Sequence, residues 1–340
     1  MNLLKKIFFL AGILFSTLVF SQKTNENSIR IGFWNVENFF DTKKDSIKND
    51  NDFTPEGKNR WTQKRFNEKK SNLCKAIVAL GEWEPPAILG FCEVENANAL
   101  QELCKNTPLA KFKYEFIHYE SEDVRGIDVA MIYRPDKFVP IESVPIKVNF
   151  QSNNSKTRDI LFVKGIVFDS DTIGLFVCHF PSKLGGSVAD ENRATAAQIL
   201  KNEAEKQLAE NPNLPLIIMG DFNDDPHSNP IKNVLGAATN TSELQNKTFY
   251  NLMSGEMNTK GSYKYQAQWS FIDQIMITKN LLSGDKLRIK NGKALVFNPD
   301  FLQVPDDKFL GTKPFRTFIG VRYTGGFSDH FPVYIDLKKK

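Results

Sequence analysis

Eight short apolar segments recur along the chain, and their order constrains the fold more than any other feature. Runs of this kind, rich in β-branched and aromatic residues, predict buried β-strands. Several follow one another with no helical pattern between them, which argues against a doubly wound parallel sheet and favours two packed sheets with helices outside. The predicted strands are Ile31–Val36, Ala87–Cys92, Val129–Tyr133, Ile160–Phe168, Ile173–Phe180, Leu216–Met219, Ile272–Ile277 and Phe331–Leu337.

Three segments have apolar residues at helical spacing instead, and these predict α-helices at Asn67–Leu80, Ala97–Lys105 and Ala189–Glu210. The polar segment 43–64, rich in Asp, Asn and Lys, is expected to be a long surface loop. We find no Pro/Ser-rich linker and no internal repeat. We therefore expect residues 22–340 to form a single large α/β domain.

The N-terminal residues 1–21 have the composition of a secretory signal peptide. Two lysines precede the apolar run Ile7–Phe20, and small or apolar residues at positions 19 and 21 suit cleavage after Ser21. A membrane anchor is the alternative, but the run is shorter than the roughly 20 apolar residues of a spanning helix. We expect a secreted protein, periplasmic or extracellular, without stable membrane insertion after cleavage.

The charge of the expected mature chain is close to zero. Residues 1–21 contain two lysines and no acid, so 42 basic and 40 acidic side chains remain, a formal charge of +2. Tight non-specific binding to nucleic acid needs a strongly basic surface that neutralises phosphates. The composition does not supply such a surface, although it leaves room for a local basic cleft.

Four cysteines are too few and too widely spaced for a zinc cluster or a disulfide scaffold. In an oxidising compartment a bridge between Cys74 and Cys104 remains open. Cys92 and Cys178 lie in apolar strands, where we expect them to be small core residues.

The stretch IIMGDFNDDPHSNP, residues 217–230, runs from apolar residues into a glycine and a dense polar cluster. This pattern predicts a loop at the C-terminal end of a buried strand, where folds commonly place catalytic groups. Asp and Asn also enrich ordinary turns, so the stretch alone leaves both interpretations open. Other predicted strands favour a site, because polar, metal-capable side chains also lie at their ends: Asn35, Glu37, Glu93, His179, Asp273, Asp329 and His330.

Six short motifs, WNVEN, CEVEN, HFPSK, GDFND, FIDQIMI and SDH, occur in this order across residues 31–337. The set resembles the endonuclease/exonuclease/phosphatase superfamily, and six motifs in order form a far stronger signal than any one of them. The resemblance implies a four-layered αββα sandwich: two mixed β-sheets face to face, flanked by helices, with the active site at one end. It also implies hydrolysis of a phosphate ester with a divalent cation. Oxygen ligands from Asp, Glu and Asn suit Mg²⁺, with Mn²⁺ or Ca²⁺ as alternatives.

For metal binding, the resemblance implies that Glu93 is the main ligand and that Asn35 assists it. Glu37 or Asp329 would complete this position or share a second one. An Asn or Glu after a strand also caps helices and turns, so Asn35 and Glu37 keep that alternative.

For catalysis, the resemblance implies that Asp221 orients or deprotonates the attacking water and that the Asn223 amide donates to the developing negative charge. His330 matches the histidine that acts as general base or phosphate ligand, with Asp273 bonding its other ring nitrogen. His179 matches a second histidine of the deoxyribonuclease and sphingomyelinase branches, where it contacts phosphate or protonates the leaving oxygen.

Two arginines are candidates for substrate binding. Arg158 resembles a phosphate-contacting arginine of deoxyribonucleases, and Arg125 lies where abasic-site enzymes have a phosphate-contacting tyrosine. A guanidinium can hold two phosphate oxygens. A surface salt bridge is the alternative for both residues.

The predicted function is a secreted, metal-dependent nuclease that hydrolyses phosphodiester bonds in nucleic acid, acting as a monomer. One alternative is a phosphatase or phospholipase C acting on inositol phosphates or sphingomyelin. The absence of a long apolar hairpin argues against a lipid hydrolase, and the absence of a basic cluster near the motifs argues against a polyphosphorylated inositol. Another alternative is a phosphate-binding module without activity, against which the complete motif set argues.

Overall fold

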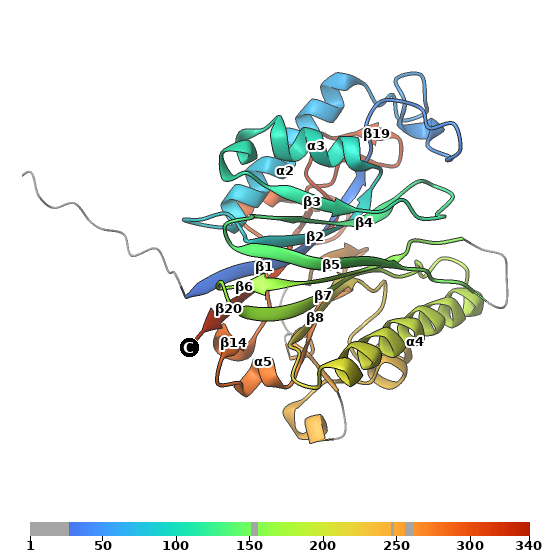
Figure 1. Cartoon of the computed structure of the whole chain (residues 1–340). Coiled ribbons are helices and arrows are strands. Elements are labelled where there is room, and N and C mark those ends of the chain that lie inside the picture. Colours follow the sequence, from blue (N-terminus) through green and yellow to red (C-terminus); the bar gives the residue numbers. More distant parts are fainter. Residues whose placement is uncertain (1–26, 151–155, 246–247, 256–260) are drawn as a thin grey trace, which may run out of the picture.

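Two mixed seven-stranded sheets lie face to face in the computed structural model, which describes residues 27–150, 156–245, 248–255 and 261–340 (Figure 1). The predicted signal peptide, residues 1–21, lies outside this range. None of the helices within the described residues has the length and apolar character needed to cross a membrane.

The first sheet contains the N- and C-terminal strands, with β1 parallel to β2 and antiparallel to β20. Its order is β14 (Leu287–Ile289), β20 (Val333–Lys339), β1 (Ser28–Phe39), β2 (Ile88–Val94), β4 (Asp128–Tyr133) and β3 (Glu115–His118), with β15 (Leu295–Val296) also pairing to β20.

The second sheet has two parallel pairs, β7 with β8 near its centre and β9 with β10 at one edge, and its other neighbours are antiparallel. Its order is β5 (Phe138–Ile146), β6 (Ile160–Val167), β7 (Asp171–His179), β8 (Leu216–Asp221), β13 (Asp273–Thr278), β10 (Phe249–Asn251) and β9 (Ala237–Ala238).

A long helix joins the strands of the pairs β1–β2 and β7–β8, as parallel strands require a crossover. Helix α2 (Gln63–Leu80) connects β1 to β2, and α4 (Ser187–Glu210) connects β7 to β8. Together with α3 (Ala97–Lys105), α2 covers the outer face of the first sheet, while α4 covers the second (Figure 1).

Short elements complete the chain. They are the hairpins β11 (Tyr263–Tyr265) with β12 (Gln268–Ser270), β16 (Gln303–Pro305) with β17 (Thr312–Pro314) and β18 (Phe318–Ile319) with β19 (Arg322–Tyr323), and the helical turns η1 (Asn51–Phe53), η2 (Pro108–Phe112), η3 (Asn229–Leu235), η4 (Thr241–Gln245), α5 (Asn280–Ser283), η5 (Lys290–Gly292) and η6 (Asp300–Leu302).

Three apolar cores separate the four layers. The central core lies between the sheets and includes Phe33, Met131 and Ile217. A second core packs α2 and α3 against the first sheet, and a third packs α4 against the second. The predicted four-layered αββα sandwich of two mixed sheets is confirmed.

The eight predicted strands and three predicted helices are all present, with ends that move by up to a few residues. Within the described residues, twelve further strands were not predicted from the sequence, and β5 and β3 are the longest of them. Strand β5 contains Pro140 and Pro145, which cannot donate to a ladder, and it is tolerated because it forms a sheet edge. Segment 43–64 is largely a loop, as predicted, but the buried Trp61 anchors it and donates from its indole N–H to the Phe40 carbonyl, at 2.9 Å.

The disulfide that the sequence left open does not form. Cys74 and Cys104 are both free and buried, as are Cys92 and Cys178. The first two lie on α2 and α3 within the second core, where they act as small apolar side chains.

Candidate active site

The ends of three neighbouring strands bring predicted catalytic residues into one row. In the register of the second sheet, Asp221 at the end of β8 pairs with His179 at the end of β7 and with Asp273 at the start of β13. Direct cross-strand partners point to the same face and lie about 5 Å apart. The strand register alone therefore holds these three side chains together, and all three are buried.

His330, which lies just before β20, reaches this row from the first sheet. Its Nδ1 lies 2.7 Å from Asp273 Oδ2, and the Ser262 hydroxyl donates to the same oxygen at 2.5 Å. The Trp34 indole N–H donates to the backbone carbonyl of His330, at 2.9 Å. Although burial favours the neutral ring, nearby carboxylates, above all Asp273, raise the pKa of His330 to about 10. His330 is therefore an imidazolium at neutral pH.

Asp221 lies between two histidines. Its Oδ2 is 3.8 Å from His179 Nε2 and 3.9 Å from His330 Nε2. The Asn35 amide donates to the same oxygen at 3.0 Å, and the backbone N–H of Asn223 donates to Oδ1 at 2.9 Å. Burial raises the pKa of Asp221 to about 7, although His330 opposes the rise. A fixed carboxyl that titrates near neutral pH suits a general base.

His179 differs from His330 in its charge. Burial, reinforced by the positive charge of Arg158, holds the pKa of His179 well below its usual range, so its ring is neutral at neutral pH. Its Nδ1 is buried without a hydrogen-bond partner. The site thus contains one charged and one neutral imidazole on either side of Asp221.

The backbone at this rim is strained. Positive φ angles occur at Glu37 (48°), Asn38 (54°), Glu93 (61°) and Asn223 (49°), and the pairing of β1 with β2 and of β2 with β4 is irregular near the first three. Left-handed non-glycine residues cost about 1–3 kcal/mol each and cluster at functional sites. Bulges of this kind also re-aim side chains. At Asn223 the strained turn directs the side-chain amide onto the Phe180 carbonyl, at 3.0 Å.

Glu93, the predicted main metal ligand, is partly open to solvent. Its Oε2 accepts the Asn38 backbone N–H at 2.9 Å, and its Oε1 accepts the Asn35 amide at 3.3 Å. The same amide bonds Asp221, while Asn35 Oδ1 accepts the Glu37 backbone N–H at 2.9 Å. In this arrangement Asn35 positions the two carboxylates relative to each other.

Glu37 lies deeper than Glu93 and is bonded to the protein. Only 3% of the residue is exposed, and its carboxylate accepts the backbone N–H groups of Thr317 at 2.6 Å and Phe318 at 3.3 Å. Burial raises the pKa of Glu37 to about 7. Burial likewise lowers the pKa of Lys69 to about 8, although Glu37 opposes that change. These contacts fix segment 315–318 beside the site and leave Glu37 little freedom to bind a cation.

Asp329 and two cations that the sequence analysis missed extend this network. Asp329 Oδ2 accepts Arg316 at 2.9 Å, and Arg316 Nε lies 3.5 Å from Glu37 Oε1. Lys69 donates to the Thr317 hydroxyl at 2.6 Å. Lys69 lies within an ordinary helical pattern and Arg316 in an irregular segment, so the sequence around each gives no indication that it lies beside the site.

The two predicted substrate-binding arginines meet at Asp123. Arg158 is 6% exposed, pairs with Asp123 at 3.3 Å and donates to the carbonyls of His179 at 3.1 Å and Phe180 at 2.8 Å. Arg125 lies 3.7 Å from Asp123 and keeps 54% of its side chain exposed. Arg158 therefore supports the backbone at His179, whereas Arg125 has the free surface that a substrate contact needs.

The donors at this rim fit a hard divalent cation. Carboxyl groups outnumber cationic groups here, and Asp273 Oδ1 is buried without a hydrogen-bond partner. Within the described residues, carboxylate oxygens of Asp221 and Asp273 lie within 4.8 Å of each other, and the protonated His330 beside them is not a ligand. Carboxylate oxygens are the ligands that Mg²⁺ and Mn²⁺ prefer.

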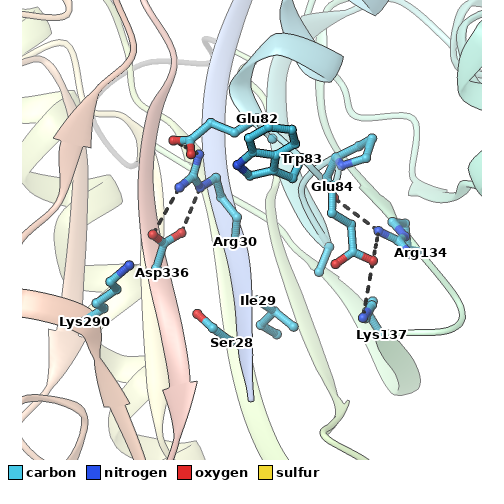
Figure 2. Close-up of a pocket in the computed structure, with 13 residues that line it drawn as sticks. Ser28, Ile29, Arg30, Glu82, Trp83, Glu84, Arg134, Lys137, Lys290 and Asp336 are labelled. Atoms are coloured by element: carbon cyan, nitrogen blue, oxygen red, sulfur yellow. Dashed lines mark hydrogen bonds and ion pairs between the residues drawn. The ribbon is translucent and has the colours of Figure 1, made fainter. Parts of the chain in front are cut away.

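A wide surface pocket lies elsewhere, at the opposite end of β1 (Figure 2). Its lining includes Arg30, paired with Asp336 at 2.8 Å, and Glu84, paired with Arg134 at 2.7 Å. Trp83 stands beside these pairs with 88% of its surface exposed. Most charges of this lining have partners within the protein, Arg30 with Glu82 and Asp336 and Glu84 with Arg134 and Lys137, so we place the chemistry at the other end.

Comparisons with known proteins agree with this fold. A sequence profile described as the Endonuclease/Exonuclease/phosphatase family matches residues 30–339. No match was found in a comparison with curated proteins.

Solved structures with the same fold share little sequence with the chain. The human Nocturnin catalytic domain with bound sulfate anion is 16% identical, with a TM-score of 0.55, covering 92% of this chain and 95% of that one. A mannosyl-6-phosphatase from Bacteroides thetaiotaomicron is 17% identical, with a TM-score of 0.56 and coverage of 91% and 99%. D. rerio TDP2 complexed with single strand DNA product is 16% identical, with a TM-score of 0.56 and coverage of 92% and 99%.

Proposed function

Because the chain belongs to the endonuclease/exonuclease/phosphatase family, whose members are hydrolases acting on phosphoesters, we propose that it is a secreted, Mg²⁺-dependent nuclease. The observation that carries the proposal is the arrangement of Asp221 between a charged and a neutral histidine, with Asp273 behind His330. Secretion rests on the signal-like composition of residues 1–21.

Asp221 is the proposed general base. Its pKa of about 7 leaves a large share of the carboxylate form at neutral pH, and Asn35 and the Asn223 backbone fix its orientation. Oδ2 accepts a proton from the attacking water as the new bond to phosphorus forms and the ester bond from phosphorus to the leaving oxygen breaks. A base whose pKa lies near the working pH combines availability with proton affinity.

His330 and His179 have different proposed roles. His330 is too basic to accept a proton at neutral pH, so its imidazolium binds a non-bridging phosphate oxygen through Nε2–H, while Asp273 fixes the ring. Preorganised charge of this kind stabilises the transition state in a buried site. The neutral His179 orients the substrate through a hydrogen bond, and Arg158 holds its backbone in place.

Glu93 is the residue that would hold the divalent cation, with Asn35 keeping it in position beside Asp221. A bound cation of this type polarises the phosphoryl oxygen and stabilises charge on the leaving group. Glu37 and Asp329 have a supporting role in this proposal. Glu37 accepts the backbone N–H groups of Thr317 and Phe318, and Asp329 accepts Arg316, so the two carboxylates hold segment 315–318 beside the site.

Nucleic acid is the proposed substrate because the second histidine resembles that of the deoxyribonuclease and sphingomyelinase branches, and the sequence has no long apolar hairpin of the kind expected in a lipid hydrolase. The exposed Arg125 supplies a cation at the rim for a second phosphate. We propose a monomer as the active form. A phosphatase or phospholipase C uses the same donors, so the substrate has to be decided by experiment.

The first test is nicking of supercoiled plasmid by the purified protein in Mg²⁺ or in EDTA, with Glu93→Ala alongside to exclude a contaminating nuclease. We expect nicking that requires Mg²⁺ and is lost in the variant. Equal nicking by wild type and variant would reject the site. If the wild type does not nick plasmid DNA, RNA is tested next. If it cleaves neither nucleic acid but releases phosphate from phosphomonoesters or head groups from phospholipids, the nuclease is rejected and the alternative is identified.

A further inference from the structure

A second group of metal-ligating side chains lies beside the first sheet, outside the row described above. His118 ends β3, Asp128 begins β4, and Glu120 lies in the loop between these strands. One ligand atom from each of the three lies within 4.8 Å of the others. None of the three has a part in the proposed hydrolysis.

Two atoms of this group are buried and unsatisfied. His118 Nε2 and Asp128 Oδ2 lie 3.5 Å apart, their side chains are 3% and 2% exposed, and neither atom has a hydrogen-bond partner. The other carboxylate oxygen of Asp128 accepts the Ser121 backbone N–H at 3.0 Å, so the side chain is held with Oδ2 toward the imidazole. Buried polar atoms without partners are rare and costly, and they require an explanation.

The spacing of the two atoms fits a shared metal ion. Two ligands on a tetrahedral ion with bonds of about 2.1 Å lie about 3.4 Å apart, close to the 3.5 Å between His118 Nε2 and Asp128 Oδ2. Glu120 is an exposed residue on a loop, so its carboxylate can move onto a third position while water takes the fourth. The Lys48 ammonium in this region is already bonded to the Ser121 and Asp123 carbonyls, at 2.5 and 3.1 Å.

We propose that His118, Glu120 and Asp128 form a binding site for a divalent transition-metal ion, with Zn²⁺ as the best fit. An imidazole with two carboxylates suits Zn²⁺ better than Mg²⁺ or Ca²⁺, which prefer all-oxygen sites. The site is separate in composition from the oxygen-rich rim that holds Glu93.

A metal here would brace the loop that supports the active site. Ligands at 118, 120 and 128 enclose segment 121–127, which contains both Asp123 and Arg125. Asp123 pairs with Arg158, which in turn holds the His179 and Phe180 carbonyls. Because Asp128 faces Val94 across the β2–β4 pair, one residue beyond Glu93, the brace would lie at the catalytic end of the sandwich.

The test measures bound zinc directly. The purified protein is stripped with EDTA, incubated with Zn²⁺, dialysed and analysed for metal content, and its melting temperature is recorded with and without Zn²⁺. We expect about one retained zinc per chain and a higher melting temperature. His118→Gln and Asp128→Asn should lose both effects, whereas Glu93→Ala and His227→Ala should keep them. His227 is an exposed histidine and serves as the matched control.

Asp128→Asn keeps an oxygen for the Ser121 N–H and places an amide against His118, so it separates loss of metal from loss of packing. Without added zinc it should melt close to the stripped wild type. Anomalous scattering at the zinc edge from wild-type crystals should give a peak between His118 and Asp128. The proposal is overturned if the wild type retains no zinc, if both variants retain it as the wild type does, or if only Glu93→Ala loses it. None of these readouts depends on hydrolysis, so the proposed nuclease can fail independently.

Discussion

The two ends of the sandwich treat their charges in opposite ways. At the catalytic end Asp221, Glu37 and Lys69 are buried, their pKa values are displaced toward neutrality, and the backbone around them is strained. At the other end Arg30 and Glu84 line a wide pocket, and their charges are paired (Figure 2). Titration displaced toward neutrality therefore marks the reactive end. Backbone strain and the size of a pocket do not, because Glu82 in the lining of the opposite pocket also has a positive φ, 58°.

The largest expected effect is on turnover in His330→Ala. Removing the imidazolium takes away the positive charge beside Asp221 and leaves Asp273 without its partner. We expect phosphodiester hydrolysis to fall about 10³- to 10⁴-fold, measured as initial rates on a labelled oligonucleotide. His227→Ala is the matched control and should keep the wild-type rate. A His330→Ala rate near that of the wild type would contradict the assignment of catalysis to the end of the sandwich that contains His330.

The sequence predicted the row of catalytic residues because each member ends or begins an apolar strand. Asp221 and Asp273 follow and precede runs that are unmistakably buried, and strand pairing then places them side by side. The layers followed from the same runs. Strand β5 was missed because it contains two prolines, which argue against a strand in the sequence. The sheet tolerates them because β5 lies at its edge and pairs only with β6.

The supporting network was not predictable in the same way. Lys69 lies on α2, whereas its partners are Thr317 and the Phe327 carbonyl, far along the chain. The resemblance implied that Glu37 or Asp329 would share in metal binding, and only the fold reveals that the backbone N–H groups of Thr317 and Phe318 bond Glu37. Such contacts depend on how loops pack, which local patterns do not encode.

The second prediction tests the buried charges themselves. Lys69→Met removes the buried ammonium, its hydrogen bonds to the Thr317 hydroxyl and the Phe327 carbonyl, and its attraction to the Glu37 carboxylate. Removing one charge from a buried network of opposite charges costs about 3–5 kcal/mol, so we expect a loss of this order in the free energy of unfolding, measured by urea denaturation. The double variant Lys69→Met/Glu37→Gln should lose less than the sum of the single changes, because the two sites are coupled. Additive losses would show that the pair is independent.

A third prediction concerns pH and the His330–Asp273 bond. The pKa of His330 rises from 6.5 to about 10 in the folded protein, so this contribution to stability is complete below pH 6.5 and is lost as the pH rises through about 10. Asp273→Asn removes the partner. We expect it to destabilise the protein by about 1.5–3 kcal/mol at pH 6, with a smaller difference from wild type at pH 10. A difference that does not change between these values would argue against a charged His330.

The smallest effect on stability and turnover is expected for a substitution at the opposite end of the sandwich. Trp83 is 88% exposed in the pocket of Figure 2 and packs little of its surface against the protein. Trp83→Ala should change the free energy of unfolding by less than about 0.5 kcal/mol and leave both kcat and KM for nucleic acid unchanged. A rise in KM without a change in kcat would mean that substrate extends to this pocket, and the two ends would then share in recognition. Unchanged constants would confine recognition, like the perturbed carboxyl groups, to the end where β1, β2 and β8 terminate.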